Sequence, residues 1–209
     1  MDMHTEASTS QQGSDTRETI VRTAHHMFME HGYRSVSTRR IADACSLTQP
    51  ALYHHFPNKE AIYLEVLRSD LARTKERLEA IEGCHTDTRK TLYEMVYYII
   101  VNSPENMSQM FQDIRRETSK DFQKKISTWW HEAYRLPMVR VFQRGIDKGE
   151  LRDPAEFGED ADKYVCLMVN MISRSIPSPG EVEESESDEL IEKRATFVVE
   201  VLLNGVGSR

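Results

Sequence analysis

The stretch STRRIADACSLTQPALYHHFPNKE, residues 37–60, decides the fold of the N-terminal part of this 209-residue chain. Ser37 and Thr48 each precede a short run with apolar side chains at helical spacing, so each is placed to cap the start of a helix. Pro50 falls in the first turn of the second helix, where a missing N–H group costs nothing. The stretch therefore predicts a short helix over 38–44, a tight turn over 44–47, and another short helix after Thr48.

Two short helices joined by such a turn, with an earlier helix packed across them, make a helix-turn-helix unit. In such a unit, the N-terminal residues of the second helix point toward base edges in the major groove of DNA. Those residues are Thr48, Gln49 and Pro50. The amide of Gln49 has the donor and the acceptor that read adenine bidentately, whereas Thr48 is expected mainly as the helix cap.

The run from Arg17 to Tyr63 resembles the DNA-binding domain of the TetR family of transcriptional regulators. In chain order, the matching residues are Ala24, Phe28, Gly32-Tyr33, Ile41-Ala42, Leu52-Tyr53-His54-His55-Phe56 and Lys59-Glu60. This sequence departs from the family at Ser46, where glycine is usual, and serine in a left-handed turn costs about 1 kcal/mol. The resemblance covers less than a quarter of the chain, and the remainder is similar only in length and helical character.

The resemblance implies DNA contacts by side chains around the turn. Ser37 would cap its helix and meet a phosphate, Arg39 would reach the DNA, and Lys59 would grip a phosphate. Tyr53 and His54 match positions that contact the DNA backbone. Hydroxyl, imidazole and ammonium groups all donate to phosphate oxygens, which fixes register without reading sequence. For Tyr53, a half-buried core ring is the alternative.

The regions on either side set the expected domain boundaries. Residues 1–15, rich in Ser, Thr and Gln, are expected to form a flexible N-terminal tail. The DNA-binding domain is expected over 16–60, with a first helix that stops at Gly32. Residues 61–209 are expected to form the effector-binding and dimerisation domain, which a long helix enters from Lys59 onward.

The whole chain is predicted to be all-α, with about nine helices, because no stretch shows strand-like alternation. A three-helix DNA-binding domain is followed by a larger helical ligand-binding and dimerisation domain. Beyond the long helix that Gly83 closes, helices are predicted at 87–102, 105–118, 120–148, 154–176 and 188–203. Pro137 predicts a kink within 120–148, because proline lacks an N–H group and its ring clashes with the preceding turn.

The middle helices carry aromatic side chains and methionines that suit an effector pocket. Residues 92–101, LYEMVYYIIV, are largely apolar and predict a helix through the interior. The candidate pocket residues are Tyr93, Tyr97, Met110, Phe111, Trp129 and Tyr134, with Arg115 and His131 as polar anchors. For each aromatic residue, an ordinary core position is the alternative.

A single reading head makes few base contacts, and a symmetric dimer binds two half-sites about one helical turn apart. The last two helices offer a dimer surface, because 154–176 is apolar nearly all round and 188–203 has an apolar stripe. The candidate interface residues are Val165, Met168, Ile172, Phe197, Val198 and Val201. A core confined to the monomer is the alternative.

Charge and cysteine content indicate the kind of partner and the cellular compartment. The net charge is −7, yet residues 17–60 carry six Lys or Arg against four acids, which favours an anionic partner there. Three cysteines without paired spacing favour a reducing cytosol and predict no metal site. The apolar run from Val96 to Val101 is too short for a membrane helix, so we expect a cytoplasmic protein without membrane contact.

The sequence has no phosphate loop, nucleophile motif or metal-ligand spacing, so no enzyme activity and no cofactor are expected. The resulting hypothesis is a ligand-responsive transcriptional regulator that binds a palindromic operator in double-stranded DNA as a homodimer. It would act as a repressor that an unidentified small-molecule effector releases. The alternatives are an activator, and a module whose helix-turn-helix unit binds a protein partner.

Overall fold

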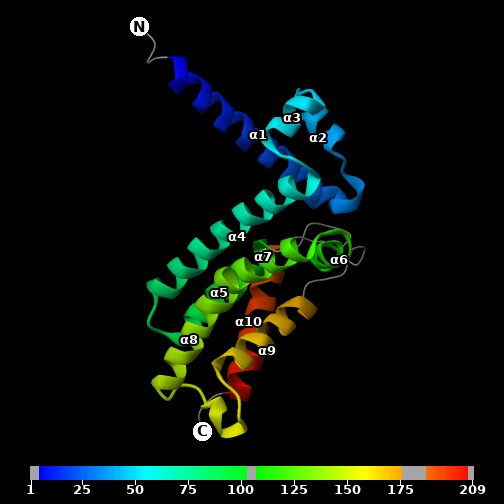
Figure 1. The fold of residues 1–209 in the computed structure, drawn as a ribbon. Coiled ribbons are helices and arrows are strands. Elements are labelled where there is room, and N and C mark those ends of the chain that lie inside the picture. Colours follow the sequence, from blue (N-terminus) through cyan, green and yellow to red (C-terminus); the bar gives the residue numbers. More distant parts are fainter. Residues whose placement is uncertain (1–4, 103–106, 176–186, 207–209) are drawn as a thin grey trace. The chain divides into compact units, whose positions relative to one another are not determined.

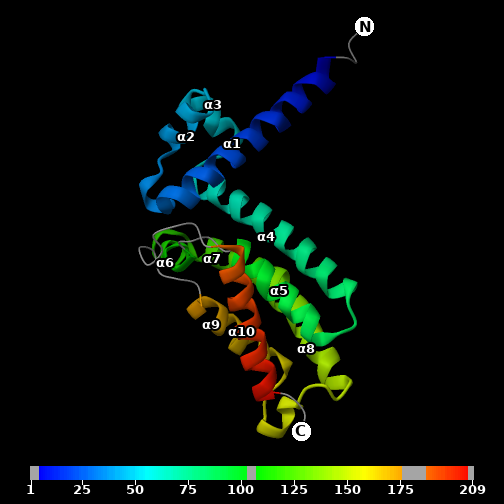
Figure 2. The ribbon, with the colours of Figure 1, turned by 180° about the vertical axis from the view of Figure 1, so that it is seen from behind.

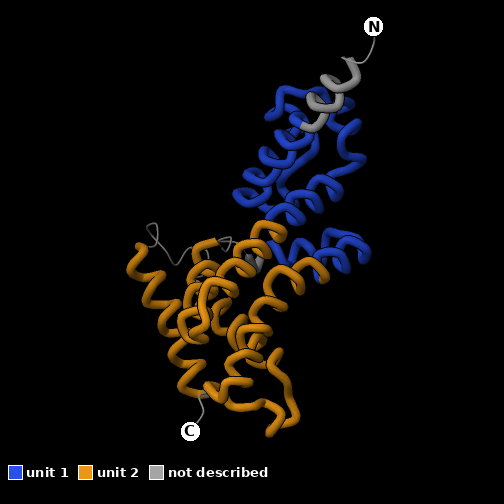
Figure 3. Tube along the Cα trace, turned by 90° about the vertical axis from the view of Figure 1, so that its left-hand side faces the viewer, with its two compact units in different colours: residues 1–70, 106–127 blue, residues 71–105, 128–209 orange. Residues whose placement is uncertain are grey.

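The computed structural model describes residues 5–102, 107–175 and 187–206, and its elements there are helices joined by turns (Figure 1). The all-α prediction is confirmed, since these residues include no strand. None of the described helices has the length and apolarity that crossing a membrane requires. The chain forms two compact units (Figure 3), which we call unit 1, residues 1–70 and 106–127, and unit 2, residues 71–105 and 128–209.

Unit 1 contains the predicted helix-turn-helix and two segments from further along the chain. It takes in the start of the long helix and the segment 106–127, and so extends beyond the 16–60 domain expected from the sequence. Its helices are α1 (Thr5–Ser35), α2 (Thr38–Ala44), α3 (Gln49–His55), the first part of α4 (Lys59–Cys84), α6 (Met107–Glu117) and most of α7 (Lys120–Trp130).

Helix α1 begins at Thr5, so helix covers part of the expected tail over 1–15, and residues 1–4 lie outside the described residues. The predicted stop at Gly32 is confirmed, because this residue breaks the helical backbone with a φ of +75°. Only glycine adopts that conformation without steric cost. The break turns the chain from α1 toward α2.

The core of unit 1 contains an aromatic cluster. The Tyr63 ring lies 4.9 Å from the ring of Phe28, 4.7 Å from that of Tyr33 and 5.6 Å from that of Phe122, centroid to centroid. The last pair is stacked, and it joins α4 to α7. Four residues from three separate parts of the sequence thus form one cluster beneath the helix-turn-helix.

Unit 2 is a helical bundle with a largely aliphatic core. Its elements are the rest of α4, α5 (Thr88–Asn102), the end of α7, a π-helical turn (His131–Arg135), α8 (Leu136–Asp147), a 3-10 turn (Pro154–Phe157), α9 (Ala161–Ser175) and α10 (Asp188–Val206). Helix α10 packs against α5 and α9, and α8 packs against α5 and α9, as both Figure 1 and Figure 2 show.

Two of the predicted helices are interrupted within unit 2. The helix expected over 120–148 opens into a π turn just before Pro137, where the Leu136 N–H group donates to the carbonyl of His131, five residues back. This irregularity stands where a kink was predicted, because the proline ring cannot fit a regular ladder. The helix expected over 154–176 is split by Gly158, whose φ of +73° ends a 3-10 turn before α9 begins.

Candidate nucleic-acid interface

Caps and a tight turn fix α2 and α3 in the described structure. Ser37 Oγ accepts a hydrogen bond from the Arg40 amide at 3.2 Å, and Thr48 Oγ1 accepts from the Ala51 amide at 3.3 Å. Between the helices, Ser46 adopts the left-handed conformation with a φ of +57°. The predicted caps and turn are confirmed, and serine stands where the backbone would favour glycine.

Helix α3 has one buried face and one exposed face. Leu52 and the following Phe56 are buried in unit 1. The exposed face holds Gln49, Pro50, Tyr53 and His54, all four of which the sequence proposed as DNA contacts. The spacing follows the helical period, so burial of Leu52 turns these side chains outward together.

Three side chains on this exposed surface form a hydrogen-bonded triangle. Gln49 Nε2 donates to Thr38 Oγ1 at 3.2 Å and to Tyr53 OH at 3.3 Å. The hydroxyls of Thr38 and Tyr53 lie 3.1 Å apart. The triangle joins the first residue of α2 to the first turn of α3 and holds the Gln49 amide in one place.

An open depression of about 490 Å³ adjoins the triangle. It is lined by Arg34, Val36, Ser37, Thr38, Tyr53, Pro57, Asn58 and Lys59. This lining includes two cations and no carboxylate, so the depression favours an anion. Asn58 also caps α4, since its Oδ1 accepts from the Ala61 amide at 2.8 Å.

The Lys59 side chain packs against the aromatic cluster of unit 1. Its Nζ lies 4.1 Å from the centroid of the Tyr33 ring, within the range of a cation–π contact. Partial burial lowers the pKa of Lys59, against the attraction of Glu117 and Asp113. Burial also raises the pKa of Tyr33 to about 12, with Glu60 and Glu117 adding to the effect.

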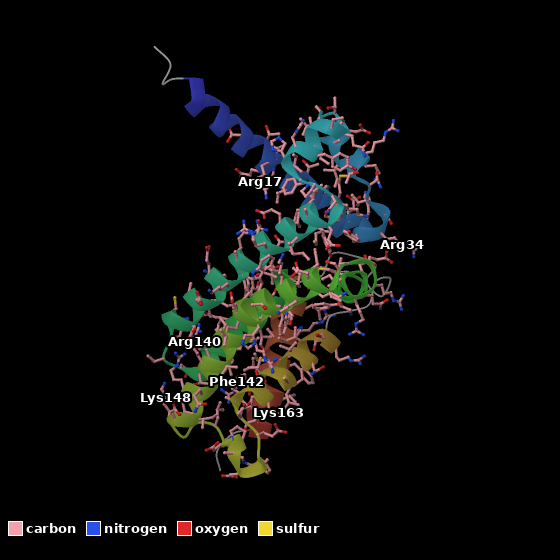
Figure 4. All side chains as sticks on the ribbon, viewed as in Figure 1. Arg17, Arg34, Arg140, Phe142, Lys148 and Lys163 are labelled. Carbon is pink, nitrogen blue, oxygen red and sulfur yellow. The ribbon has the colours of Figure 1, made fainter. Side chains whose placement is uncertain are left out.

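Arg17 attaches α3 to α1, on which it is labelled in Figure 4. Its Nη1 donates to the carbonyl of His55 at 2.9 Å, and its guanidinium carbon lies 4.1 Å from the centroid of the Phe56 ring. Its Nη2 lies 3.6 Å from a carboxylate oxygen of Glu65 on α4. This side chain of α1 therefore contacts both the C-terminal end of α3 and helix α4.

Two carboxylates connect the helix-turn-helix to the segment 106–127. Buried Asp113 on α6 accepts a hydrogen bond from the Tyr33 amide at 3.1 Å, directly after the break at Gly32. At the start of α4, Glu60 accepts from both the amide and the hydroxyl of Ser119. All three hydrogen bonds lie within unit 1, so the segment that carries α6 and the start of α7 supports the helix-turn-helix.

Ser37 and Arg39, which were also predicted to contact DNA, both lie at or near the start of α2. The Ser37 hydroxyl serves as the α2 cap and borders the depression, and Arg39 is exposed on α2. The sequence reasoning missed Thr38 as part of the triangle and Arg17 as a support of α3. No periodicity or cap pattern could have found Arg17, because its partners depend on how α1 crosses α3. Thr38 carried a weak signal, as a hydroxyl directly after the capping Ser37.

The predicted effector residues fall into two groups. Met110, Phe111 and Arg115 lie on α6 in unit 1, whereas the other five lie in unit 2, namely Tyr93, Tyr97, Trp129, His131 and Tyr134. The rings of Tyr93 and Tyr97 stack with centroids 6.3 Å apart, and both pack against the core of unit 2. The Tyr134 ring stacks on Trp130, the neighbour of Trp129, at 5.7 Å.

The predicted interface residues also divide. Val165, Met168, Ile172 and Val198 are buried in the core of unit 2 itself, so their side chains are not at its surface. Phe197 and Val201 on α10 are 61% and 47% exposed. An apolar stripe indicates that a helix face is buried, but not whether the core of the same unit or a partner subunit covers it. The sequence pattern therefore could not separate the core residues from the exposed ones. Leu190 on α10 and Leu167 on α9 are further exposed apolar side chains that the sequence reasoning left out.

Comparison with known proteins gives a consistent result. A family model for bacterial regulatory proteins of the tetR family matches residues 20–66. The HTH-type transcriptional repressor AcnR of Corynebacterium efficiens is 30% identical over 143 residues, which cover 66% of this chain and 70% of that protein.

Solved structures share the fold over nearly the whole chain. A transcriptional regulator from Saccharomonospora viridis, in complex with choline, matches with a TM-score of 0.73 at 19% identity, covering 94% of this chain and 100% of that one. FadR of Bacillus subtilis, in complex with stearoyl-CoA, matches with a TM-score of 0.72 at 18% identity, covering 90% and 98%.

Proposed function

Since the chain belongs to the TetR family of transcriptional regulators, we propose that it represses its target genes as a homodimer on a palindromic operator and leaves the operator when a small molecule binds. The chain is a DNA-binding regulator and not an enzyme. The observation that carries the DNA-binding part is the exposed polar face of α3 beside a depression lined by two cations and no carboxylate.

We propose that different residues contact the phosphates and the bases. Arg34 and Lys59 in the depression receive a backbone phosphate, with Tyr53 and Ser37 at its border. His54 and Arg39, both exposed, extend the backbone contacts to either side. Gln49 and Pro50, at the start of α3, meet base edges, as expected for the N-terminal end of a recognition helix.

Dimerisation uses the apolar surface that unit 2 leaves exposed. Leu190, Phe197 and Val201 follow one another along α10 at helical spacing, and Leu167 lies on the adjoining helix α9. Contiguous exposed apolar side chains of this kind mark interaction surfaces. A two-fold arrangement of these helices would bury them and present two reading heads to two half-sites.

The effector is proposed to bind at the aromatic residues of unit 2. Tyr93, Tyr97, Trp129 and Tyr134 supply apolar faces, and exposed His131 supplies a polar anchor. Helix α4 has residues in both units, so a ligand that favours one conformation of α4 would also favour one state of the head. Such coupling typically amounts to about 1–3 kcal/mol.

The test of DNA binding is selection of duplexes from a random pool by the full-length protein, followed by a salt titration on the best duplex. Affinity should fall steeply as salt rises, because bound phosphates displace counterions. Lys59→Ala should lower affinity on all duplexes and reduce the salt slope by about one. Lys90→Ala, which removes an exposed lysine on α5 of unit 2, is the matched control and should change neither quantity.

Failure of a verified dimer to retain any duplex in dilute buffer would overturn the proposal. The release step is then tested by adding small molecules to the complex. Choline and stearoyl-CoA, the ligands of two structurally similar regulators, are the first probes. A compound that releases DNA from the wild type and not from a Tyr97→Ala variant that still binds DNA would support the effector site.

A further inference from the structure

We propose that Thr38 is a positioning residue for base reading: together with Tyr53 it holds the Gln49 amide with Nε2 toward the two hydroxyls, so that Oε1 is the end presented to the DNA. Gln49 then selects a base that offers a hydrogen-bond donor in the major groove, adenine through N6 or cytosine through N4. This inference rests on the proposed DNA-binding function. It assigns a role to a residue outside the expected contacts and a base class to one operator position.

The amide geometry carries the argument. A glutamine side chain has two N–H donors on Nε2 and an acceptor on Oε1. In the triangle, Nε2 donates to Thr38 Oγ1 at 3.2 Å and to Tyr53 OH at 3.3 Å, so this end of the amide is turned toward the two hydroxyls. Oε1 takes no part in the triangle, and it diverges from Nε2 because the amide is planar. The exposed Gln49 therefore offers an acceptor to a partner.

The base edges then decide the preference. In the major groove, adenine and cytosine each expose an amino group, whereas guanine and thymine expose carbonyl acceptors there. An acceptor on Gln49 favours the first pair and repels the second. Bidentate reading of adenine, the expectation from the sequence alone, would add a hydrogen bond from Nε2 to N7 of the base.

Two residues of the triangle also belong to the proposed phosphate site. Thr38 and Tyr53 line the depression that is proposed to take a phosphate, whereas Gln49 lies outside its lining. The hydroxyls of Thr38 and Tyr53 are hydrogen-bonded to each other at 3.1 Å, so a shift of one hydroxyl also moves the other. Both accept hydrogen bonds from the Gln49 amide, whose position therefore shifts with them. Gln49 is thus oriented by the same two side chains that border the backbone contact.

The experiment compares base preferences selected from a random duplex pool by the full-length wild type and by variants. Gln49→Ala identifies the operator position that depends on Gln49, because preference is lost at that position. In the wild type, adenine and cytosine together should be enriched there over guanine and thymine by about tenfold. Preference for guanine or thymine, or the absence of a Gln49-dependent position, would overturn the inference.

Thr38→Val then removes the hydroxyl while keeping the shape of the side chain. The freed amide can present either of its ends, so the preference at that position should fall from about tenfold to about twofold. Thr38→Ser keeps a hydroxyl and should keep the preference. A phosphate contact could not produce this pattern, since phosphate contacts carry no sequence information.

Several outcomes separate this inference from simpler roles of Thr38. A Thr38→Val variant that binds all duplexes more weakly but keeps the base preference would leave Thr38 as a structural or phosphate contact and overturn the inference. Should Thr38→Val fail to fold, Tyr53→Phe provides the second test, because it removes the other acceptor and should flatten the same position. If no duplex is selected by the wild type, the proposed function itself fails, which is a different result.

Discussion

The core of unit 1 contains a cluster of four aromatic rings, and carboxylates bond its segments together. Unit 2 has a mostly aliphatic core and leaves apolar side chains on its surface. In unit 1, Tyr63 contacts three other rings, and Asp113 accepts from the amide at the only helix break of α1. In unit 2, Phe197 remains 61% exposed beside a closely packed interior. Unit 1 therefore presents polar groups with fixed directions, and unit 2 presents an apolar surface.

This difference suits two kinds of recognition. Hydrogen bonds are directional, so a surface held by caps and side-chain bonds can distinguish one base from another. Apolar burial is proportional to area and has no direction, so an apolar stripe favours association with a complementary helix. Substitutions confined to one unit at a time test this contrast.

The largest effect is expected from Phe122→Ala. Phe122 is buried and stacks on Tyr63, although it lies far beyond the helix-turn-helix in sequence. Its loss should lower the free energy of unfolding by about 3–5 kcal/mol. Amide hydrogen exchange should show lost protection in α1–α3. Phe111→Ala, on the same segment but 45% exposed, is the control and should have little effect. Unchanged protection of α1–α3 in Phe122→Ala would mean that the head is independent of segment 106–127.

Phe197→Glu tests the apolar surface of unit 2. If α10 forms the dimer interface, a buried unpaired carboxylate should raise the dissociation constant of the dimer by roughly a hundredfold, or about 3 kcal/mol. Analytical ultracentrifugation measures the change, while the monomer should stay folded because Phe197 contributes little to its core. Phe157→Glu, at a position 67% exposed in the 3-10 turn, is the matched control. Dissociation by Phe157→Glu and not by Phe197→Glu would place the interface elsewhere.

The same contrast explains how far the sequence could be read. The caps at Ser37, Thr48 and Asn58 act on amides within the next three residues, so sequence alone located α2, α3 and the start of α4. The exposed face of α3 followed from the position of Leu52. The bond from Gln49 to Thr38 could not be predicted, because it depends on the angle between two helices.

In unit 2, periodicity predicted that helices have apolar faces but not which neighbour covers them. Met168 and Phe197 both belong to apolar patterns, yet the structure buries the first and exposes the second. The break at Gly158 was missed because a left-handed glycine inside an otherwise helical pattern is easily taken as a helix residue. The π turn before Pro137 was anticipated only as a kink.

A smaller effect is expected when the carboxylate beneath the break of α1 is removed. In Asp113→Ala, the buried Tyr33 amide loses its acceptor at 3.1 Å, which should cost about 1–3 kcal/mol of stability. Asp113→Asn retains an acceptor oxygen and should lose less. Asp121→Ala, an exposed residue paired with Lys125, serves as the control. Equal urea midpoints for Asp113→Ala and Asp121→Ala would show that Asp113 does not close unit 1.

The smallest effect concerns the aromatic core at alkaline pH. Burial raises the pKa of Tyr33 to about 12 from an ordinary 10.0, so the folded protein keeps this proton over a range in which the unfolded chain loses it. The stability that the neutral phenol contributes is complete below pH 10 and is lost as the pH rises toward 12.

Urea unfolding at pH 9 and at pH 11 measures this loss. The wild type should lose roughly 1 kcal/mol more than Tyr33→Phe between the two pH values, because the variant has no phenol to ionise there. Tyr53→Phe removes a hydroxyl from the exposed face of α3 and should lose as much stability as the wild type.

Burial raises the pKa of Tyr63 as well, so Tyr33→Phe should keep part of the loss of stability at alkaline pH. If Tyr33→Phe and the wild type lost the same stability, the Tyr33 phenol would have to be as accessible to water in the folded protein as in the unfolded chain. The aromatic core of unit 1 would then not be closed at the point where Lys59 and Asp113 meet it.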